Sequence, residues 1–262
     1  MTIDVVATDL DAVLDWRERY RQEMNCQIVH DSWHARGFTD QYSLGLDGVM
    51  VGYGAVAGDP GEPKDTVKEF YLEPPHRGAG PELLRALIAA SGAQWIEAQT
   101  NDFLLSVLLF DCAVEISSRT VLFADGFATQ LEVPGAEVRR LSAAERAAVF
   151  RHTTEPVGDW GVVVGGQVVA TGGYFLHYNP PFADLYMEVA PDARRQGYGS
   201  LLVQEVKREC TAARRVPAAR CHSENEASRR TLQRAGLVPC GRIVRGRVAA
   251  ESVNRASHSA SA

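Results

Sequence analysis

Residues 194–200 read Arg-Arg-Gln-Gly-Tyr-Gly-Ser and stand between a strand-like run, Asp184–Val189, and a helix-like run, Ser200–Cys210. Glycine has no Cβ, so Gly197 and Gly199 let an anion approach the backbone N–H groups closely. The unpaired amides of the first helical turn, at the positive end of the helix dipole, favour a ligand that carries a di- or triphosphate. The stretch predicts a phosphate-binding turn, although a tight turn without a ligand satisfies the same pattern.

The spacing argues against two other glycine motifs. A dinucleotide-binding turn has a third glycine where Leu202 stands, and the next strand-like run ends at residues 222–224 without a clear ribose-binding acid. A Walker loop needs Gly-Lys-Ser/Thr, which the chain lacks.

The array around the turn resembles the GCN5-related N-acetyltransferase (GNAT) superfamily. The matching positions are Val189-Ala190-Pro191, Arg194-x-x-Gly197-x-Gly199, Asn225-x-Ala227-Ser228, Leu232 and Ala235-Gly236-Leu237. The resemblance implies an α/β fold of the α+β kind, with a mixed, twisted sheet flanked by helices. Its central strands would splay apart to admit the pantetheine arm of acetyl-CoA.

The resemblance also assigns cofactor contacts. The exposed backbone of Glu188 and Val189 would pair with pantetheine, and Asn225 and Ser228 would face the cofactor from the start of the next helix. The pyrophosphate would be wrapped by Arg194, Arg195, Gln196, Gly197, Tyr198, Gly199 and Ser200. Asn225 is equally suited to a simple helix cap, and the two roles can coexist.

The implied chemistry is direct attack of a neutral amine on the thioester, which needs a base and an acid. Glu188 is the candidate base because it ends the central strand beside the expected thioester. Many family members have a tyrosine that serves as general acid at the position of Leu232. In this chain Tyr186 or Tyr178 is therefore the candidate acid, or the thiolate leaves unprotonated. Cys221 is expected to be inert packing.

The chain contains an internal repeat. A shift of 119 residues takes Gly78 to Gly197, Gly54 to Gly173 and the turn at Asp47 to that at Gly166. We therefore expect two copies of one fold: a degenerate domain over residues 1–130, a second domain with the cofactor site over 131–249, and a disordered tail over 250–262.

Local patterns predict the elements of both copies. The first should have a helix over 10–25, a hairpin over 41–57, a strand over 67–72, a helix over 81–91 and a buried apolar helix over 103–110. The second copy should have fewer elements at its N-terminal end, with one short helix over 142–151. In the first copy, Pro75 replaces the arginine of the turn, and Pro81 removes a backbone N–H near the first helical turn. We therefore expect the second copy to bind the cofactor. The first copy is expected to shape the acceptor site or a dimer surface.

Composition narrows the class of protein. The chain has 262 residues, 45% hydrophobic, and no apolar run near the roughly 20 residues that span a bilayer. No basic signal start is visible, so a cytoplasmic location is expected, and five scattered cysteines suggest neither disulfides nor a metal site.

The charge is uneven. The net charge is −6, yet residues 194–247 hold thirteen Arg or Lys against four Asp or Glu. This basic segment suits an anion such as coenzyme A, whereas nucleic acid is not expected because base-stacking aromatics are missing.

The sequence thus predicts an acyl-CoA-dependent N-acyltransferase that transfers acetyl from acetyl-CoA to an amine in a ternary complex. The acceptor, a small molecule or a protein amino group, is not readable, and a homodimer stays open. The alternatives are a non-catalytic acyl-CoA-binding regulatory protein and an interaction protein whose glycine turns bind nothing.

Overall fold

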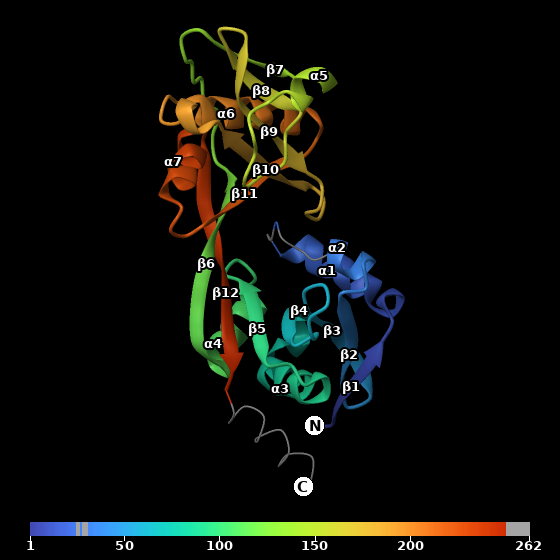
Figure 1. The fold of residues 1–262 in the computed structure, drawn as a ribbon. Helices are drawn as coiled ribbons and strands as arrows, with labels where there is room; N and C mark the ends of the chain where they lie inside the picture. Colours follow the sequence, from blue (N-terminus) through green and yellow to red (C-terminus); the bar gives the residue numbers. More distant parts are fainter. Residues whose placement is uncertain (25–26, 28–30, 250–262) are drawn as a thin grey trace. The chain divides into compact units, whose positions relative to one another are not determined.

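The computed structural model describes residues 1–24, 27 and 31–249. They form two compact units (Figure 1). The N-terminal unit holds Met1–Arg119 and the segment from Gly241 onward, and the C-terminal unit holds Thr120–Cys240. The tail predicted over 250–262 lies outside the described residues.

The N-terminal unit consists of β1 (Ile3–Thr8), η1 (Leu10–Val13), α1 (Leu14–Glu23), α2 (Asp31–Ala35), β2 (Thr39–Leu46), β3 (Val49–Ala57), β4 (Thr66–Leu72), η2 (Pro74–Ala79), α3 (Gly80–Ser91), β5 (Trp95–Gln99) and α4 (Phe103–Cys112), where η marks a 3₁₀ helix. The C-terminal unit consists of β7 (Ala136–Arg140), α5 (Ala143–Ala147), β8 (Trp160–Val164), β9 (Gln167–Phe175), β10 (Phe182–Val189), η3 (Pro191–Ala193), α6 (Tyr198–Ala212), β11 (Val216–His222) and α7 (Glu226–Arg234). Two long strands, β6 (Ala113–Asp125) and β12 (Leu237–Val248), run from one unit into the other.

These two strands complete the sheets. In the N-terminal unit the strand order is β1-β2-β3-β4-β5-β12, with Ile243–Arg247 of β12 antiparallel to β5. In the C-terminal unit the order is β6-β11-β10-β9-β8-β7, with Thr120–Ala124 of β6 antiparallel to β11. The units therefore divide at 119/120 and 240/241, whereas the repeat alone placed the divisions at 130/131 and 249/250.

The turns and helix ends follow local chemistry. Asp47 and Gly48 both have positive φ, as do Gly165 and Gly166, which gives both hairpins the tight two-residue turn that matches the twist of paired strands. Gly92 ends α3 in the left-handed conformation, with φ +72°.

Two predicted helices differ from the observed ones. The helix expected over 142–151 is shorter than predicted and consists of α5 alone. A capping box between Ser142 and Glu145 begins it, and Ala148 is its C-cap. The helix expected to be buried over 103–110 is buried on one face alone. Phe103, Val107 and Phe110 of α4 are 67%, 59% and 60% exposed.

Each sheet packs against helices. In the N-terminal unit, η1 and α1 place Val13 and Tyr20 against Tyr53 and Tyr71, while α3 and α4 belong to a separate, larger core. In the C-terminal unit, α6 covers the core, where Leu202, Val203 and Val206 pack with apolar side chains of β8, β9 and β10.

The central strands of the C-terminal unit separate along their length. β10 and β11 are parallel neighbours only over Phe182–Asp184 and Val216–Ala218. Beyond this point β10 stays paired with β9 as far as Val189, and β11 stays paired with β6 as far as His222. The splayed strands implied by the resemblance are therefore confirmed.

Candidate functional site: the splayed strands and the turn before α6

The turn before α6 has the open geometry that an anion requires. Gly197 has φ +90° and Arg195 has φ +63°, and α6 begins at Tyr198. The first helical amide to bond is Leu201, which donates to the Gly197 carbonyl. Within the described part of the chain, the amides of residues 195–200 donate no hydrogen bond. Six N–H groups without an acceptor among the described residues thus lie in the turn and in the first turn of α6, at the positive end of a 15-residue helix.

Side chains of the turn are partly engaged. Arg194 Nε lies 3.3 Å from the Val189 carbonyl oxygen, to which it donates, and the Tyr198 hydroxyl donates to Gln196. Ser200 is buried and its hydroxyl donates to the Thr231 carbonyl, which ties α6 to α7. Ser200 therefore offers a ligand its amide rather than its hydroxyl.

The start of α7 lies beside β11. Asn225 is the N-cap, and its Oδ1 accepts from the Ser228 amide at 3.0 Å. The predicted cap is confirmed, and it leaves the NH₂ group of Asn225 without a partner among the described residues. Ser228 lies beside Cys221, whose thiol pKa is raised by burial, so the thiol form predominates.

The two faces of β10 carry different kinds of side chain. Leu185, Met187 and Val189 point into the core under α6. By the two-residue period of a strand, Asp184, Tyr186 and Glu188 lie on the opposite face. The catalytic residues predicted on β10 therefore share the face away from α6.

Glu188 is held by a loop. Its carboxylate accepts four hydrogen bonds of 2.9–3.0 Å, from the amide and hydroxyl of Thr153 and the amides of Thr154 and Glu155. Burial opposes ionisation, but these donors lower the pKa of Glu188 to about 2. An anion this well satisfied is a weak proton acceptor.

The two tyrosines are suited to keep their protons. Burial raises the pKa of Tyr186, whose ring stacks on Phe175 with centroids 4.3 Å apart. Burial and the nearby Asp184 carboxylate raise the pKa of Tyr178 well above its usual value. Both side chains are thus protonated near neutral pH, as a general acid must be.

Several residues at this site were missed by the sequence analysis. Thr171, paired with Glu188 across β9 and β10, accepts from the Gly158 amide and lies 3.2 Å from His152 Nε2. Asp184, at the point of separation, lies 3.2 Å from His177 Nε2 and 3.7 Å from Arg220 Nε. Only the tertiary fold brings these residues together, because they come from separate loops and strands. Leu232 is buried in the core and supplies packing.

An ion pair bridges the corresponding gap of the N-terminal unit. β4 and β5 pair only at Thr66 and Val67, and a Lys68–Glu97 ion pair of 3.2 Å joins the two strands beyond that point. A small cavity of about 10 Å³ lies beside it, next to Tyr20 and Asp102. The segment equivalent to the turn is the helix η2, in which Gly78 has no positive φ.

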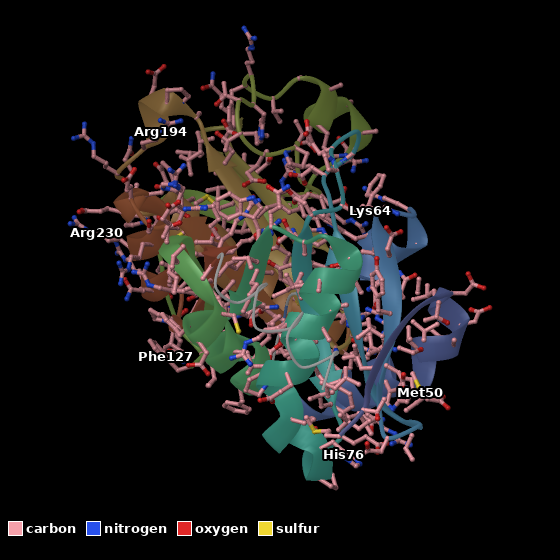
Figure 2. All side chains as sticks on the ribbon, turned by 90° about the horizontal axis from the view of Figure 1, so that it is seen from below. Met50, Lys64, His76, Phe127, Arg194 and Arg230 are labelled. Carbon is pink, nitrogen blue, oxygen red and sulfur yellow. The ribbon has the colours of Figure 1, made fainter. Side chains whose placement is uncertain are left out.

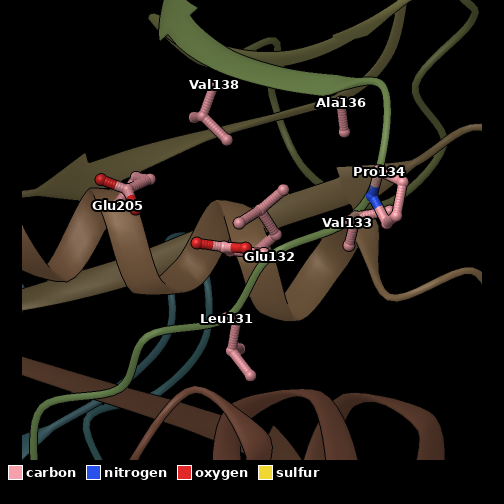
Figure 3. A pocket seen from close by; sticks show the side chains of 8 residues that line it. Leu131, Glu132, Val133, Pro134, Ala136, Val138 and Glu205 are labelled. Carbon is pink, nitrogen blue, oxygen red and sulfur yellow. The ribbon is translucent and has the colours of Figure 1, made fainter.

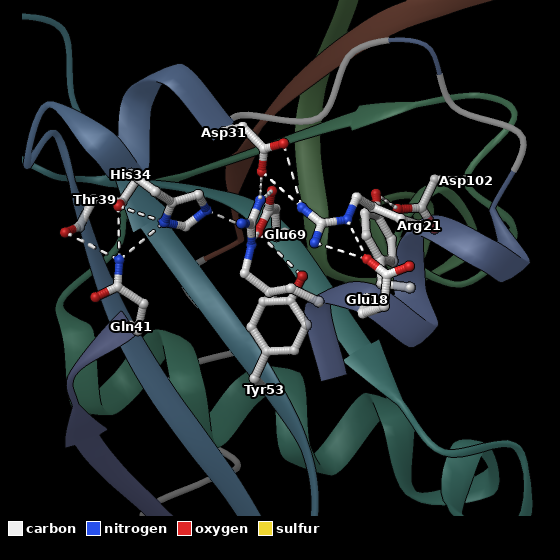
Figure 4. Close-up of polar contacts among 11 residues, drawn as sticks. Glu18, Arg21, Asp31, His34, Thr39, Gln41, Tyr53, Glu69 and Asp102 are labelled. Carbon is white, nitrogen blue, oxygen red and sulfur yellow. Dashed lines mark hydrogen bonds and ion pairs between the residues drawn. The ribbon is translucent and has the colours of Figure 1, made fainter. Parts of the chain in front are cut away.

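The space around Glu69 of β4 in the N-terminal unit is filled by the unit's own side chains (Figure 4). A shift of 119 residues takes Glu69 to Glu188, and Glu69 is wholly buried against Arg17, His34 and Tyr53, with polar contacts of 3.0–3.2 Å. The register differs in the preceding hairpins: Glu69 pairs with Ala55 and Glu188 with Thr171, which that shift does not relate.

A larger pocket, of about 430 Å³, lies between β7, α6 and residues 131–134 (Figure 3). Apolar side chains dominate its lining, and its two charged groups are the carboxylates of Glu132 and Glu205. Because both carry negative charge, this pocket does not suit a phosphate.

Comparison with known proteins agrees with this geometry. The model of the acetyltransferase (GNAT) family matches residues 128–237. A GNAT-family acetyltransferase from Colwellia psychrerythraea has a similar structure, with a TM-score of 0.72 and 16% identity over 95% of this chain and 100% of that one. A tandem GNAT protein from the clavulanic acid biosynthesis pathway is similar with a TM-score of 0.57 and 12% identity, over 94% and 98%. No curated sequence matches at a significant level.

At these identities the two structures show the fold, and the family model identifies a GNAT acetyltransferase domain within the chain. Residues 128–237, which make up most of the C-terminal unit, match the model of the GNAT acetyltransferase family. Members generally use acetyl-CoA as co-substrate, which supports an acyl-CoA-dependent acyltransferase. No helix among the described residues is long and apolar enough to cross a membrane.

Proposed function

We propose that the protein is an N-acetyltransferase that binds one acetyl-CoA per chain, in the C-terminal unit, and transfers the acetyl group to a primary amine. The observation that carries the proposal is the six undonated amides of residues 195–200, set at the mouth of the separated strands β10 and β11. The turn would take the diphosphate and the strand gap the pantetheine arm.

The two units differ in the features that binding needs. The N-terminal unit has an ion pair across its strand gap and a helix in place of the open turn. The C-terminal unit has a left-handed glycine and free amides. A single cofactor site per chain follows from this contrast, and the N-terminal unit has a structural or acceptor-shaping role.

Titration calorimetry with acetyl-CoA tests the site. Gly197→Glu should abolish binding, because a side chain at φ +90° is strained and its carboxylate would repel the phosphates. Gly78→Glu is the matched control: a Cβ at Gly78 meets nothing within 4 Å, so one site per chain should remain. Thermal melting would confirm that both variants fold. Equal binding by both variants would contradict the assignment.

In the transfer, the amine nitrogen bonds to the carbonyl carbon and gives up a proton to a base or to water, the carbon–sulfur bond breaks, and the thiolate takes a proton. Tyr186 or Tyr178 supplies that proton, since both are held in the protonated form. Substituting each by Phe should lower kcat by about 10²-fold for the true acid, and leave it nearly unchanged for the other.

The role of Glu188 as general base stays a prediction, and its surroundings favour a positioning role for the loop at 153–155. We expect Glu188→Gln to lower kcat/KM at every pH while the pH profile keeps its shape. A new rise of the rate with hydroxide concentration would instead show that Glu188 is the base, because hydroxide would then replace it.

A non-catalytic acyl-CoA-binding protein is the alternative, which Leu232 at the usual position of the acid leaves open. Release of free thiol from acetyl-CoA across a panel of amines separates the two. Binding without amine-dependent thiol release would support the binding protein.

A further inference from the structure

One arginine that the sequence analysis did not single out lies against the turn. Arg234 is the last residue of α7, and its side chain is exposed. A Cβ built on Gly197 would lie 3.8 Å from its Nη1 and 4.0 Å from its Nη2. The guanidinium therefore faces the same backbone that presents the free amides.

Arg234 makes no ion pair with any described residue. Arg230 of the same helix pairs with Glu226 at 2.8 Å, and Arg194 is bonded to the Val189 carbonyl. Arg194 and Arg230 both lie on the rim of the C-terminal unit in Figure 2. Arg234 is thus a cation held beside the turn without a protein anion.

Its position is electrostatically unfavourable without a ligand. The N-terminus of α6 carries partial positive charge, so a cation beside Gly197 is repelled. Arg234 is also the last residue of α7, where a cation interacts favourably with the C-terminal carbonyl groups. That interaction does not explain why the side chain lies beside Gly197. An anion between the guanidinium and the amides would turn the repulsion into attraction on both sides.

We propose that Arg234 binds the diphosphate of acyl-CoA and closes the side of the turn that the backbone leaves open. The inference rests on the proposed function. A planar guanidinium offers paired N–H donors that match two phosphate oxygens, which a lysine cannot reproduce.

The test compares ligands as well as variants. Calorimetry would measure the dissociation constants of coenzyme A and of 3′-dephospho-coenzyme A for the full-length protein, Arg234→Gln, Arg234→Lys and Arg230→Gln. Arg230→Gln is the matched control, because it removes the same charge from an exposed position of the same helix.

We expect Arg234→Gln to weaken both ligands by the same factor, about tenfold, and Arg230→Gln to change either by less than about twofold. Arg234→Lys should recover only part of the affinity. Loss confined to coenzyme A would assign Arg234 to the 3′-phosphate and overturn the proposal, as would equal effects of Arg234→Gln and Arg230→Gln. Absence of binding by the unaltered protein would instead overturn the proposed function, and this inference with it.

Discussion

The pKa values of two buried carboxylates of this protein are shifted in opposite directions. Glu188 accepts four hydrogen bonds, and its pKa falls to about 2. Asp102 caps α4 by accepting from the Leu105 amide, and it accepts from the Tyr20 hydroxyl at 2.9 Å. Burial nevertheless raises the pKa of Asp102 to about 6. The number of donors relative to the loss of water decides the direction.

The raised pKa of Asp102 predicts a pH effect on stability. The folded state keeps its proton up to about pH 6, whereas the unfolded carboxyl loses it near 3.8, so stability falls as pH rises through this window. Asp102→Asn keeps an oxygen for the cap and removes the charge. We expect it to raise the free energy of unfolding at pH 7, by about 3 kcal/mol at most, with no gain at pH 3.5.

Denaturant unfolding at the two pH values measures this effect. Asp111→Asn, on an exposed carboxylate of the same helix, is the control and should leave the pH dependence unchanged. A gain that is the same at both pH values would contradict the assignment to Asp102.

At the scale of elements, one buried ion pair joins α1 to β4. Arg17 contacts Glu69 through two hydrogen bonds of 3.2 Å, and its Nη2 lies 2.8 Å from Asp31. Although burial opposes it, Arg17 together with His34 holds the pKa of Glu69 well below its usual range. His34 is itself fixed by Thr39 and Gln41 of β2 (Figure 4).

Removing one partner of this pair should be costly, because a buried charge is left alone. We expect Arg17→Met to lower the free energy of unfolding of the N-terminal unit by about 3–5 kcal/mol. Arg19→Met on the same helix breaks the more exposed pair with Glu73 and should cost less than about 1 kcal/mol. Similar losses for the two variants, in denaturant unfolding followed by tryptophan fluorescence, would show that the network is not a stabilising unit.

Local elements were predictable where the residue types of a short segment by themselves determine the backbone conformation. The hairpin turn at Asp47, the end of α3 at Gly92 and the turn at Gly197 depend on backbone conformations that few residue types adopt. The length of α5 and the one-sided burial of α4 were not predictable, because capping and packing partners decide them. Asn225 was readable as a cap, whereas the loop that binds Glu188 was not, since its residues lie 33–35 positions away.

For the whole molecule, the decisive feature is the pair of strands that run through both units. β12 leaves the C-terminal unit and completes the N-terminal sheet beside β5, where Val244 and Val248 join the core. β6 runs the other way and pairs with β11. In each unit, one strand of the sheet therefore begins among the residues of the other unit.

Truncation tests this dependence. A chain that ends at Cys240 should lose hydrogen-exchange protection in β5, over residues 95–99, although the deletion lies more than a hundred residues away in sequence. β9 of the C-terminal unit should keep its protection, because its partners β8 and β10 remain. A chain that ends at Ala249 retains β12 and is the control. Unchanged protection of β5 in the shorter chain would contradict the role of β12.

The sequence by itself determined the resemblance to GNAT proteins, the tandem repeat and the position of the glycine turn before α6, because these rest on short patterns in which glycine, proline and charge act locally. The tertiary structure decided which residues meet on the acceptor face, which strand completes each sheet and which arginine reaches the turn. Those outcomes depend on contacts between residues far apart in the chain, and burial and pairing set their energies only after the strands have taken their places.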